Sequence, residues 1–299
     1  MITRTLGRTG LEVTQLSFGT LELRGPKSWS GRPVTDRQAD ELLNAVLDEG
    51  INFIDTAPEY GDSEEYIGRF ISSRRNEFRL ATKCGCEPED RGERLELLHR
   101  WSGDTLLGNI DASLARMQTD HIDLLQLHNP TVDEVRHGGL VEVLRSIQEQ
   151  GLARFIGVST TLPHLLGFLE MGVFDVFQVP YSALEPRHHD AISMVAEAGA
   201  GVIIRGGIAQ GGPRSGQAHR FRADIWHQAD LQDLCDGMSP AELLLRYTLT
   251  HPHCHTSLVG TLSVDHLRQN VQAAARGPLP PALYHEIRQR VAAAMTTRI

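Results

Sequence analysis

The chain has 299 residues, of which 40% are hydrophobic and 22% charged, and its formal net charge is −9. This composition excludes a disordered, collagen-like or membrane-bundle protein. The negative charge, with no basic stripe on any expected helix, argues against nucleic acid or an anionic membrane surface as the main partner, so small molecules are the expected ligands.

The N-terminus and the cysteines bear on the cellular compartment. Residues 1–4 lack the basic flank and apolar run of a signal peptide, and no segment reaches about 18 uninterrupted apolar residues. Four cysteines are too few for a disulfide scaffold. We therefore expect a cytoplasmic protein with free thiols, which exists as a monomer or weak oligomer because no apolar surface patch is evident.

Short β-branched runs alternate with amphipathic segments along the whole chain. Residues 3–13 are expected to form a hairpin around a glycine-bearing turn. Eight strands are then expected at residues 15–19, 52–55, 79–83, 122–127, 154–158, 175–179, 201–205 and 256–260. Helices are expected at residues 36–49, 63–72, 104–117, 139–150, 162–170, 187–197, 240–250, 264–274 and 281–294. No linker interrupts this alternation, so residues 1–299 are predicted to form one domain.

Strand–helix alternation predicts parallel strands joined by right-handed crossovers, and eight such units favour a closed (β/α)8 TIM barrel over an open sheet. The N-terminal β-hairpin would close the barrel bottom. Two connections are long: residues 206–237, which are polar and glycine-rich, and residues 87–103. Each is expected to be a functional loop or lid, or else disordered, and both would rise from the carboxyl rim of the barrel, where active sites form.

Titratable residues end three successive strands of this predicted barrel. Asp55 follows the second strand, Lys83 ends the third and His128 ends the fourth, while Tyr60 lies in the loop after Asp55. Of the 29 basic residues only Lys27 and Lys83 are lysines, which favours a site that requires a compact ammonium group. We therefore expect these four side chains to converge at the rim.

Their combined chemistry suits the conversion of a carbonyl to an alkoxide. Asp55 would hold Lys83 charged, and the ammonium group would lower the pKa of Tyr60, so that the phenol gives or accepts a proton near neutrality. His128 would donate to the substrate oxygen. The alternative interpretation is a rim salt bridge between Asp55 and Lys83, with a core tyrosine and a capping histidine; clusters of titratable groups at barrel rims are more often functional.

Residues 50–64, which contain Asp55 and Tyr60, together with residues 81–83 and 125–128, resemble the signature blocks of the aldo-keto reductase superfamily. The resemblance runs from the hairpin to Asn270. It implies a (β/α)8 reductase that reduces an aldehyde or ketone of a small molecule, with Asp55, Tyr60, Lys83 and His128 as the catalytic tetrad and Tyr60 as general acid.

The resemblance also implies cofactor-binding residues at the later strand ends. Ser159 and Thr160 would face the nicotinamide amide, although Thr160 stands where the family usually has Asn; Gln178 would bind the carboxamide and Tyr181 would stack on the nicotinamide ring. The other implied residues are Gly19 and Thr20 near the nicotinamide, Arg205, Gly206 and Gly207 at the pyrophosphate, and Gly260, Thr261, Ser263, His266, Gln269 and Asn270 at the adenosine, with Gln269 in place of the usual Glu.

The block after the eighth strand predicts a preference for NADP(H). Thr261 and Ser263 offer hydroxyls, Arg268 offers a cation, and the following helix offers its N-terminal N–H groups, while residues 260–263 contain no acid that would accept the free ribose hydroxyls of NAD(H). The substrate mouth is predicted to be apolar and aromatic, lined by Leu23 or Trp29 and by Trp101.

The sequence leaves three alternative functions. A metal enzyme would use His251, His253, Cys254 and His255, or Cys84 and Cys86, but strand alternation separates the first group and Pro252 marks an ordinary turn, so no metal is predicted. A Schiff-base aldolase would use Lys83. The third alternative is a cofactor-binding regulatory or sensor protein with slow turnover.

Overall fold

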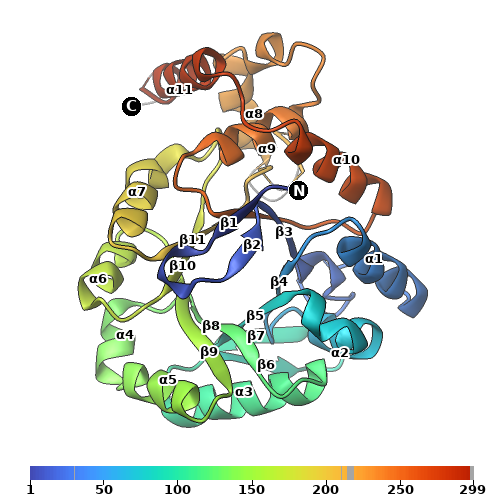
Figure 1. The fold of residues 1–299 in the computed structure, drawn as a ribbon, viewed down its shortest axis with the longest axis vertical. Helices are drawn as coiled ribbons and strands as arrows, with labels where there is room; N and C mark the ends of the chain where they lie inside the picture. Colours follow the sequence, from blue (N-terminus) through green and yellow to red (C-terminus); the bar gives the residue numbers. More distant parts are fainter. Residues whose placement is uncertain (30, 210, 214–218, 297–299) are drawn as a thin grey trace.

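In a computed structural model, which describes residues 1–29, 31–209, 211–213 and 219–296, eight parallel strands form a closed barrel (Figure 1). Around the barrel the strands follow the order β10, β11, β12, β3, β4, β5, β8, β9. Their bounds are β3 (Leu16–Gly19), β4 (Phe53–Asp55), β5 (Arg79–Cys84), β8 (Ile122–His128), β9 (Ala153–Ser159), β10 (Val176–Pro180), β11 (Gly201–Arg205) and β12 (Thr256–Val259). The predicted (β/α)8 barrel is confirmed.

Helices surround this barrel. They are α1 (Asp36–Asp48), α2 (Ser63–Ile71), α3 (Gly103–Met117), α4 (Val132–His137), α5 (Leu140–Glu149), α6 (His164–Met171), α7 (His189–Glu197), α8 (His219–Gln228), α9 (Pro240–Thr250), α10 (Val264–Ala275) and α11 (Pro281–Thr296). Short 3₁₀ turns connect some of them: η1 (Gly7–Thr9), η2 (Thr20–Leu23), η3 (Ser72–Glu77), η4 (Pro186–His188) and η5 (Leu231–Leu234). Helices α4 and α8 are additional to the predicted set.

The N-terminal hairpin closes one end of the barrel, as predicted. Strands β1 (Thr3–Thr5) and β2 (Glu12–Thr14) pair antiparallel and cross the barrel opening in Figure 1. Three hairpin side chains, Leu6, Leu11 and Val13, are buried in the interior cluster of the barrel. The apolar surface that they remove from water fixes the hairpin as a plug.

Strand alternation divides the barrel interior into an apolar and a polar layer. Next to the hairpin, the interior cluster contains one apolar residue from each of several strands: Phe53, Ala81, Leu124, Val176 and Ile203. Two residues further along the same strands, on the same face, come Asp55, Lys83, Gln126, Gln178 and Arg205. The polar layer therefore lies at the carboxyl end, where barrel enzymes hold their active sites.

The two long connections both contain regular structure. Residues 87–103, expected as a loop, belong largely to an antiparallel hairpin of β6 (Cys86–Asp90) and β7 (Leu95–His99), in which Cys86 pairs with His99. Within residues 206–237, the expected loop is replaced in part by α8 and η5, because Ile225, Trp226 and Leu231 are buried in the core. Figure 1 shows α8 beside α11, outside the ring of helices.

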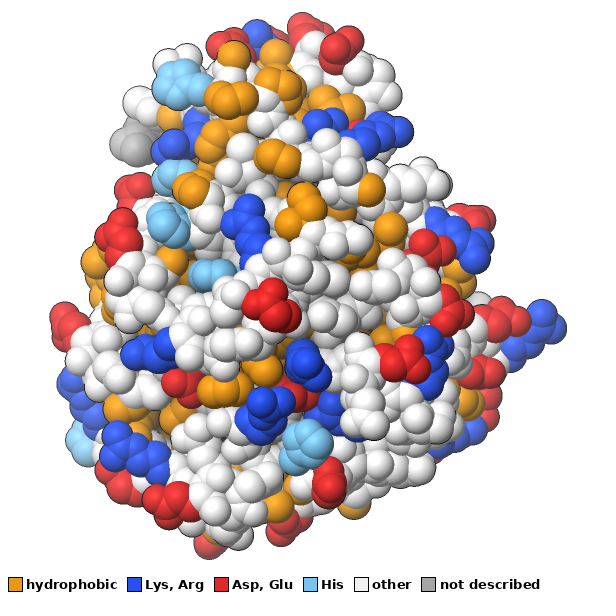
Figure 2. Space-filling model, viewed as in Figure 1, with side chains coloured by type: hydrophobic (Ala, Val, Ile, Leu, Met, Phe, Trp, Pro, Cys, Tyr) orange, Lys and Arg blue, Asp and Glu red, His pale blue; other side chains and the backbone are white. Residues whose placement is uncertain are grey.

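The surface seen from the hairpin side carries both signs of charge. In Figure 2, Lys and Arg side chains are interspersed with Asp and Glu over the barrel, and hydrophobic side chains are more frequent toward the α11 end of this view. Exposed pairs such as Lys27 with Asp90, at 2.8 Å, contribute little to stability because solvent screens them. Within the described part of the chain, no helix is both long enough and apolar enough to cross a membrane.

Candidate active site

A buried ion pair forms the centre of the polar layer. Lys83 Nζ, fully buried, donates to Asp55 Oδ2 at 2.6 Å and to the carbonyl oxygen of Thr56 at 2.9 Å. The other carboxylate oxygen, Asp55 Oδ1, accepts from Gln126 Nε2 at 2.9 Å and from Gln178 Nε2 at 2.8 Å. Although burial acts to lower it, Asp55 raises the pKa of Lys83 above its ordinary value. The lysine is therefore held charged in a fixed position.

Tyr60 lies against this ion pair. Lys83 Nζ is 4.9 Å from the centroid of the phenol ring, a cation–π distance. The expected lowering of the Tyr60 pKa is wrong in its net direction: burial raises the pKa above its ordinary value, and the opposing effect of Lys83 is smaller. In the protein alone, Tyr60 is therefore a protonated phenol across the neutral range, as a proton donor must be.

His128 completes the tetrad at the end of β8. Its ring centroid lies 6.1 Å from that of Tyr60. Burial, followed by the charge of Lys83, holds the pKa of His128 well below its ordinary value, so the imidazole is neutral. The structure thus brings together all four residues that the sequence singled out.

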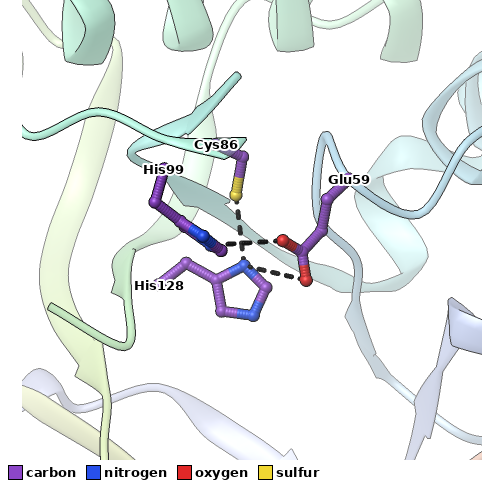
Figure 3. A group of neighbouring side chains, drawn as sticks. All are labelled: Glu59, Cys86, His99 and His128. Carbon is purple, nitrogen blue, oxygen red and sulfur yellow. Dashed lines mark hydrogen bonds and ion pairs between the residues drawn. The ribbon is translucent and has the colours of Figure 1, made fainter. Parts of the chain in front are cut away.

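His128 also belongs to a second group, which we call the rim cluster: Glu59, Cys86, His99 and His128 (Figure 3). His128 Nδ1 lies 3.1 Å from Cys86 Sγ and 3.5 Å from Glu59 Oε1, and His99 Nε2 lies 3.2 Å from Glu59 Oε2. Burial, with a further contribution from Glu59, raises the pKa of the Cys86 thiol well above its ordinary value. Cys86 was a candidate ligand from the sequence, whereas Glu59 and His99 were not, because Glu59 lies in the loop after β4 and His99 at the end of β7.

Of the three residues predicted to line the substrate mouth, only the two tryptophans lie near the surface. Trp101 stacks on the His99 ring, with centroids 5.7 Å apart, and Trp29 is partly exposed with the Arg24 guanidinium over its ring. The prediction for Leu23 is wrong: its side chain is completely buried in the hydrophobic core between the barrel and its helices. An aromatic mouth beside His128 therefore rests on Trp101.

Several polar atoms at the rim are buried without a hydrogen-bond partner among the described residues. They include Thr20 Oγ1, Ser159 Oγ and Arg205 Nε. Burial of an unpaired polar group costs about 1–3 kcal/mol, so a bound ligand or ordered water is expected to satisfy these atoms. Gly19, beside Thr20, pairs with Asp55 in the barrel. These residues fit a bound nicotinamide, for which the sequence analysis selected Gly19, Thr20 and Ser159.

Two residues expected at the nicotinamide, Gln178 on β10 and Tyr181 directly after it, have partners within the protein. Gln178, expected at the carboxamide, donates from its side-chain Nε2 to Asp55 Oδ1. Its main-chain carbonyl oxygen accepts from the Thr160 N–H at 3.0 Å. The stacking role of Tyr181 is wrong: its side chain points outward into the core, and Tyr181 Oη lies 3.0 Å from His189 Nδ1 and 3.2 Å from Tyr247 Oη. Strand alternation explains this: successive side chains point to opposite faces, and Tyr181 comes three residues after Gln178, so the two side chains lie on opposite faces.

A cavity of about 620 Å³ lies between the loop after β11 and the start of α10. Its lining includes five of the predicted adenosine residues: Gly260, Thr261, His266, Gln269 and Asn270. The other lining residues were not predicted; they are Ile208, Gly211, Gly212, Pro213, Trp226, His227, Gln232, Ser239, Pro240 and Ala241. The run of two glycines and a proline at residues 211–213 is the sequence feature that could have indicated this part of the cavity. Gly206 and Gly207 begin the loop that leads to this cavity.

Two residues expected to bind the ribose phosphate have other partners. Ser263 Oγ accepts from the His266 N–H at 3.3 Å and so caps α10. Arg268 Nε donates to Glu49 Oε1 at 3.0 Å, on the exposed side of α10. The cation expected from Arg268 is therefore paired with the carboxylate of Glu49, the residue that follows α1.

The histidines before β12 are engaged in structural contacts. His251 Nε2 lies 3.2 Å from the carbonyl oxygen of His189, and His255 Nδ1 accepts from the Val202 N–H at 3.0 Å. Cys254 is buried in the core. The polar atoms of His251 and His255 thus face different neighbours.

A closed barrel with a buried lysine–carboxylate pair, a tyrosine and a histidine at its carboxyl rim defines a class of barrel oxidoreductases. The chain matches the model of the Aldo/keto reductase family over residues 15–291 and belongs to this family. Members of the family use nicotinamide cofactors and act on carbonyl groups of small molecules.

The chain is similar to several individual proteins. It is 25% identical to the uncharacterized oxidoreductase YqkF of Bacillus subtilis over 292 residues, which cover 91% of this chain and 90% of that protein. It is 30% identical to the NADH-specific methylglyoxal reductase of Escherichia coli over 195 residues, 60% of this chain and 59% of that one. The holo form of the aldo-keto reductase AKR11C1 from Bacillus halodurans superimposes with a TM-score of 0.82, at 28% identity, over 98% of this chain and 96% of that chain.

Proposed function

We propose that this protein reduces an aldehyde or ketone of a small molecule to an alcohol, with NADP(H) as cofactor and Tyr60 as the general acid. The observation that carries the proposal is the position of Tyr60 beside the buried pair of Lys83 and Asp55. Lys83 Nζ lies 4.9 Å from the centroid of the Tyr60 ring and 2.6 Å from Asp55 Oδ2. Burying such an ion pair costs free energy, and its stability does not require a tyrosine beside it.

The residues of the chain supply the proton and the charge stabilisation. Tyr60 Oη donates its proton to the carbonyl oxygen as negative charge develops there, and the Lys83 ammonium group stabilises the resulting phenolate. Asp55, fixed by Gln126 and Gln178, keeps the ammonium group in place. A bound nicotinamide supplies the hydride.

His128 positions the substrate. Because its low pKa keeps the imidazole neutral, it donates a single hydrogen bond to the carbonyl oxygen and does not compete with Tyr60 as the acid. Trp101 and His99, stacked on each other beside His128, form one wall of the mouth. This wall favours a substrate with an apolar or sugar-like face next to its carbonyl.

The preference for NADP(H) rests on the polarity of the cavity at α10. Its described lining contains no Asp or Glu that would accept free ribose hydroxyls, whereas Thr261, His227 and His266 offer donors, and the N-terminus of α10 favours an anion. The relative in Escherichia coli is named as NADH-specific, so the preference of this protein for NADPH over NADH has to be measured.

The test is a panel of aldehydes and ketones with NADPH and with NADH, followed at the nicotinamide absorbance. We expect turnover of at least one carbonyl class, with a lower KM for NADPH. No turnover across the panel, together with tight nucleotide binding, would favour the cofactor-sensing alternative. Tighter binding of NADH than of NADPH at low salt would refute the preference for the phosphate.

A further inference from the structure

The rim cluster combines the ligand types of a transition-metal site. Glu59 follows β4, Cys86 and His99 face each other across the first pair of the β6–β7 hairpin, and His128 ends β8. Their donor atoms, one carboxylate oxygen, one sulfur and two imidazole nitrogens, all lie within 4.8 Å of one another, and Figure 3 shows them directed at a common centre.

We propose that the rim cluster binds one Zn²⁺ ion through Glu59, Cys86, His99 and His128 Nδ1. This site goes beyond the proposed reductase activity and does not depend on it. A set of one sulfur, two imidazole nitrogens and one carboxylate selects Zn²⁺ and its neighbours Co²⁺ and Ni²⁺, and it disfavours Mg²⁺ and Ca²⁺, which require oxygen ligands.

The distances within the cluster suit a tetrahedral ion. Bonds of about 2.0–2.3 Å to Zn²⁺ place neighbouring ligand atoms roughly 3.3–3.8 Å apart. Three contacts of the cluster already measure 3.1, 3.2 and 3.5 Å. Small rotations of the side chains would open a central position for the ion, and the three separate backbone segments need not move far.

The charges also balance. Binding would release the thiol proton of Cys86 to solvent, after which the thiolate and the Glu59 carboxylate neutralise the two charges of the ion. The nearest cation of the catalytic tetrad, Lys83, is already paired with Asp55 at 2.6 Å, which offsets its repulsion of the metal. His99, the most exposed ligand with a side chain 34% accessible, gives the ion a route from solvent.

A metal here would have two consequences. It would join the β6–β7 hairpin to the barrel rim at Glu59 and His128, so the hairpin would be fixed over the substrate mouth. It would also occupy Nδ1 of His128 and hold the proton on Nε2, which Figure 3 shows on the side of the ring away from the cluster. The imidazole would then remain a donor toward a substrate.

The test is a titration of the full-length, reduced protein with Co²⁺, followed by absorption spectroscopy. We expect one equivalent to bind, with a thiolate-to-cobalt charge-transfer band and the visible bands of tetrahedral Co²⁺, and one equivalent of Zn²⁺ to displace it. Zn²⁺ should also raise the midpoint of thermal unfolding, because it binds only the folded protein.

Two matched pairs of variants locate the site. Cys86→Ala should lose the charge-transfer band, whereas Cys84→Ala, which removes a buried thiol two residues away that contacts the carbonyl oxygen of Gln126, should keep it. His99→Ala should weaken Co²⁺ binding by about tenfold or more, whereas His121→Ala, an exposed histidine beside Asp120, should leave it unchanged.

The proposal is overturned if wild-type protein shows no charge-transfer band, or if the band persists in Cys86→Ala. Should Cys86→Ala fail to fold, His99→Ala decides, since this partly exposed side chain can be removed without opening the core. Unaltered Co²⁺ affinity in His99→Ala would then exclude the rim cluster. Reductase activity plays no part in these readouts, so failure here is distinct from failure of the proposed function.

Discussion

Two sides of the barrel rim differ in how completely their charged groups are paired, although Thr56 Oγ1 and Gln126 Oε1 on the first of these sides also have no partner among the described residues. On the tetrad side, formed by β4, β5 and β8, the Lys83 ammonium group has two oxygen partners and the Asp55 carboxylate accepts three donors. On the cofactor side, Thr20 Oγ1, Ser159 Oγ and Arg205 Nε have no partner among the described residues, and a cavity of about 620 Å³ opens beside α10.

This difference indicates that the two sides acquire their order differently. The tetrad is preorganised by the protein itself, which reduces the reorganisation required at the moment of reaction. The cofactor side keeps buried polar atoms, among them Arg205 Nε, that have no partner among the described residues, so nucleotide binding should stabilise it selectively. Substitutions on the two sides should therefore separate catalysis from binding.

The largest effect is expected from Tyr60→Phe. Loss of the phenolic proton should lower kcat for carbonyl reduction by about 10²–10⁴-fold, with nucleotide affinity nearly unchanged. Steady-state kinetics and a fluorescence titration with NADPH measure the two quantities. Tyr66→Phe is the matched control, because that hydroxyl donates to the carbonyl oxygen of Val34, away from the tetrad. Equal turnover in Tyr60→Phe and wild type would remove Tyr60 as the acid.

Substitution of Lys83 should affect both stability and activity. Lys83→Met leaves the Asp55 carboxylate without its cation and should lower the free energy of unfolding by about 3–5 kcal/mol. Lys83→Arg keeps the charge, but the planar guanidinium cannot replace the ammonium group against Asp55 and Thr56, so activity should also be lost. Lys27→Met, which removes an exposed lysine, is the control for urea unfolding and kinetics. Retained activity in Lys83→Arg would contradict the requirement for an ammonium group.

The strand residues of the tetrad side were predictable from the sequence because their geometry follows from strand alternation, whereas Tyr60 lies in the loop after β4. Asp55 and Lys83 each stand two residues after an apolar interior residue, and Gln126 and His128 continue the same face of β8. The same rule, applied to β10, separates Gln178 from Tyr181 and would have corrected the stacking role given to Tyr181. The family resemblance alone does not supply that distinction.

The remainder depends on contacts between distant segments. The rim cluster joins Glu59, His99 and His128 from three loops or strand ends, and no spacing in the sequence predicts this convergence. Helix α8 was missed because the polar, glycine-rich residues before it suggested a loop, while its burial comes from packing near α11. Arg268 was assigned to the nucleotide, but the face of α10 on which it lies directs it to Glu49.

The tetrad side should show little pH dependence in the neutral range. Tyr60 must be protonated to act as the acid, and because burial raises its pKa above about 10, it stays protonated as pH rises to 9. His128, with its pKa well below about 6.5, stays neutral over the same interval. We expect kcat for reduction to vary by less than about threefold between pH 6 and 9. A decline centred near pH 6.5–7.5 in wild type that is absent in His128→Ala would contradict the neutral histidine.

A smaller effect is expected from Tyr181→Phe. The hydroxyl of Tyr181 contacts His189, Tyr247 and Tyr284 in the core, so its removal should lower the free energy of unfolding by about 1–2 kcal/mol in urea denaturation. Nucleotide affinity should change by less than about twofold, since a hydroxyl buried in the core does not line the cavity. A strong loss of NADPH affinity with unchanged stability would reinstate a role for Tyr181 at the nicotinamide.

The smallest effect is expected from Arg268→Ala, which divides the cofactor side itself. Arg268 and Gln269 are neighbours on α10, but Arg268 pairs with Glu49 on the exposed face whereas Gln269 lines the cavity. Gln269→Ala should weaken NADPH binding by about five- to tenfold, as expected for one lost hydrogen bond. Arg268→Ala should weaken it by less than about twofold and leave its salt dependence unchanged, because an exposed ion pair contributes little. The measurement is a fluorescence titration of each variant with NADPH and NADH at two salt concentrations. If Arg268→Ala instead weakened the binding of NADPH alone by more than tenfold, the arginine would have to leave Glu49 and contact the ribose phosphate when the nucleotide binds. The preference for NADPH would then depend on this rearrangement and not on the residues that line the cavity.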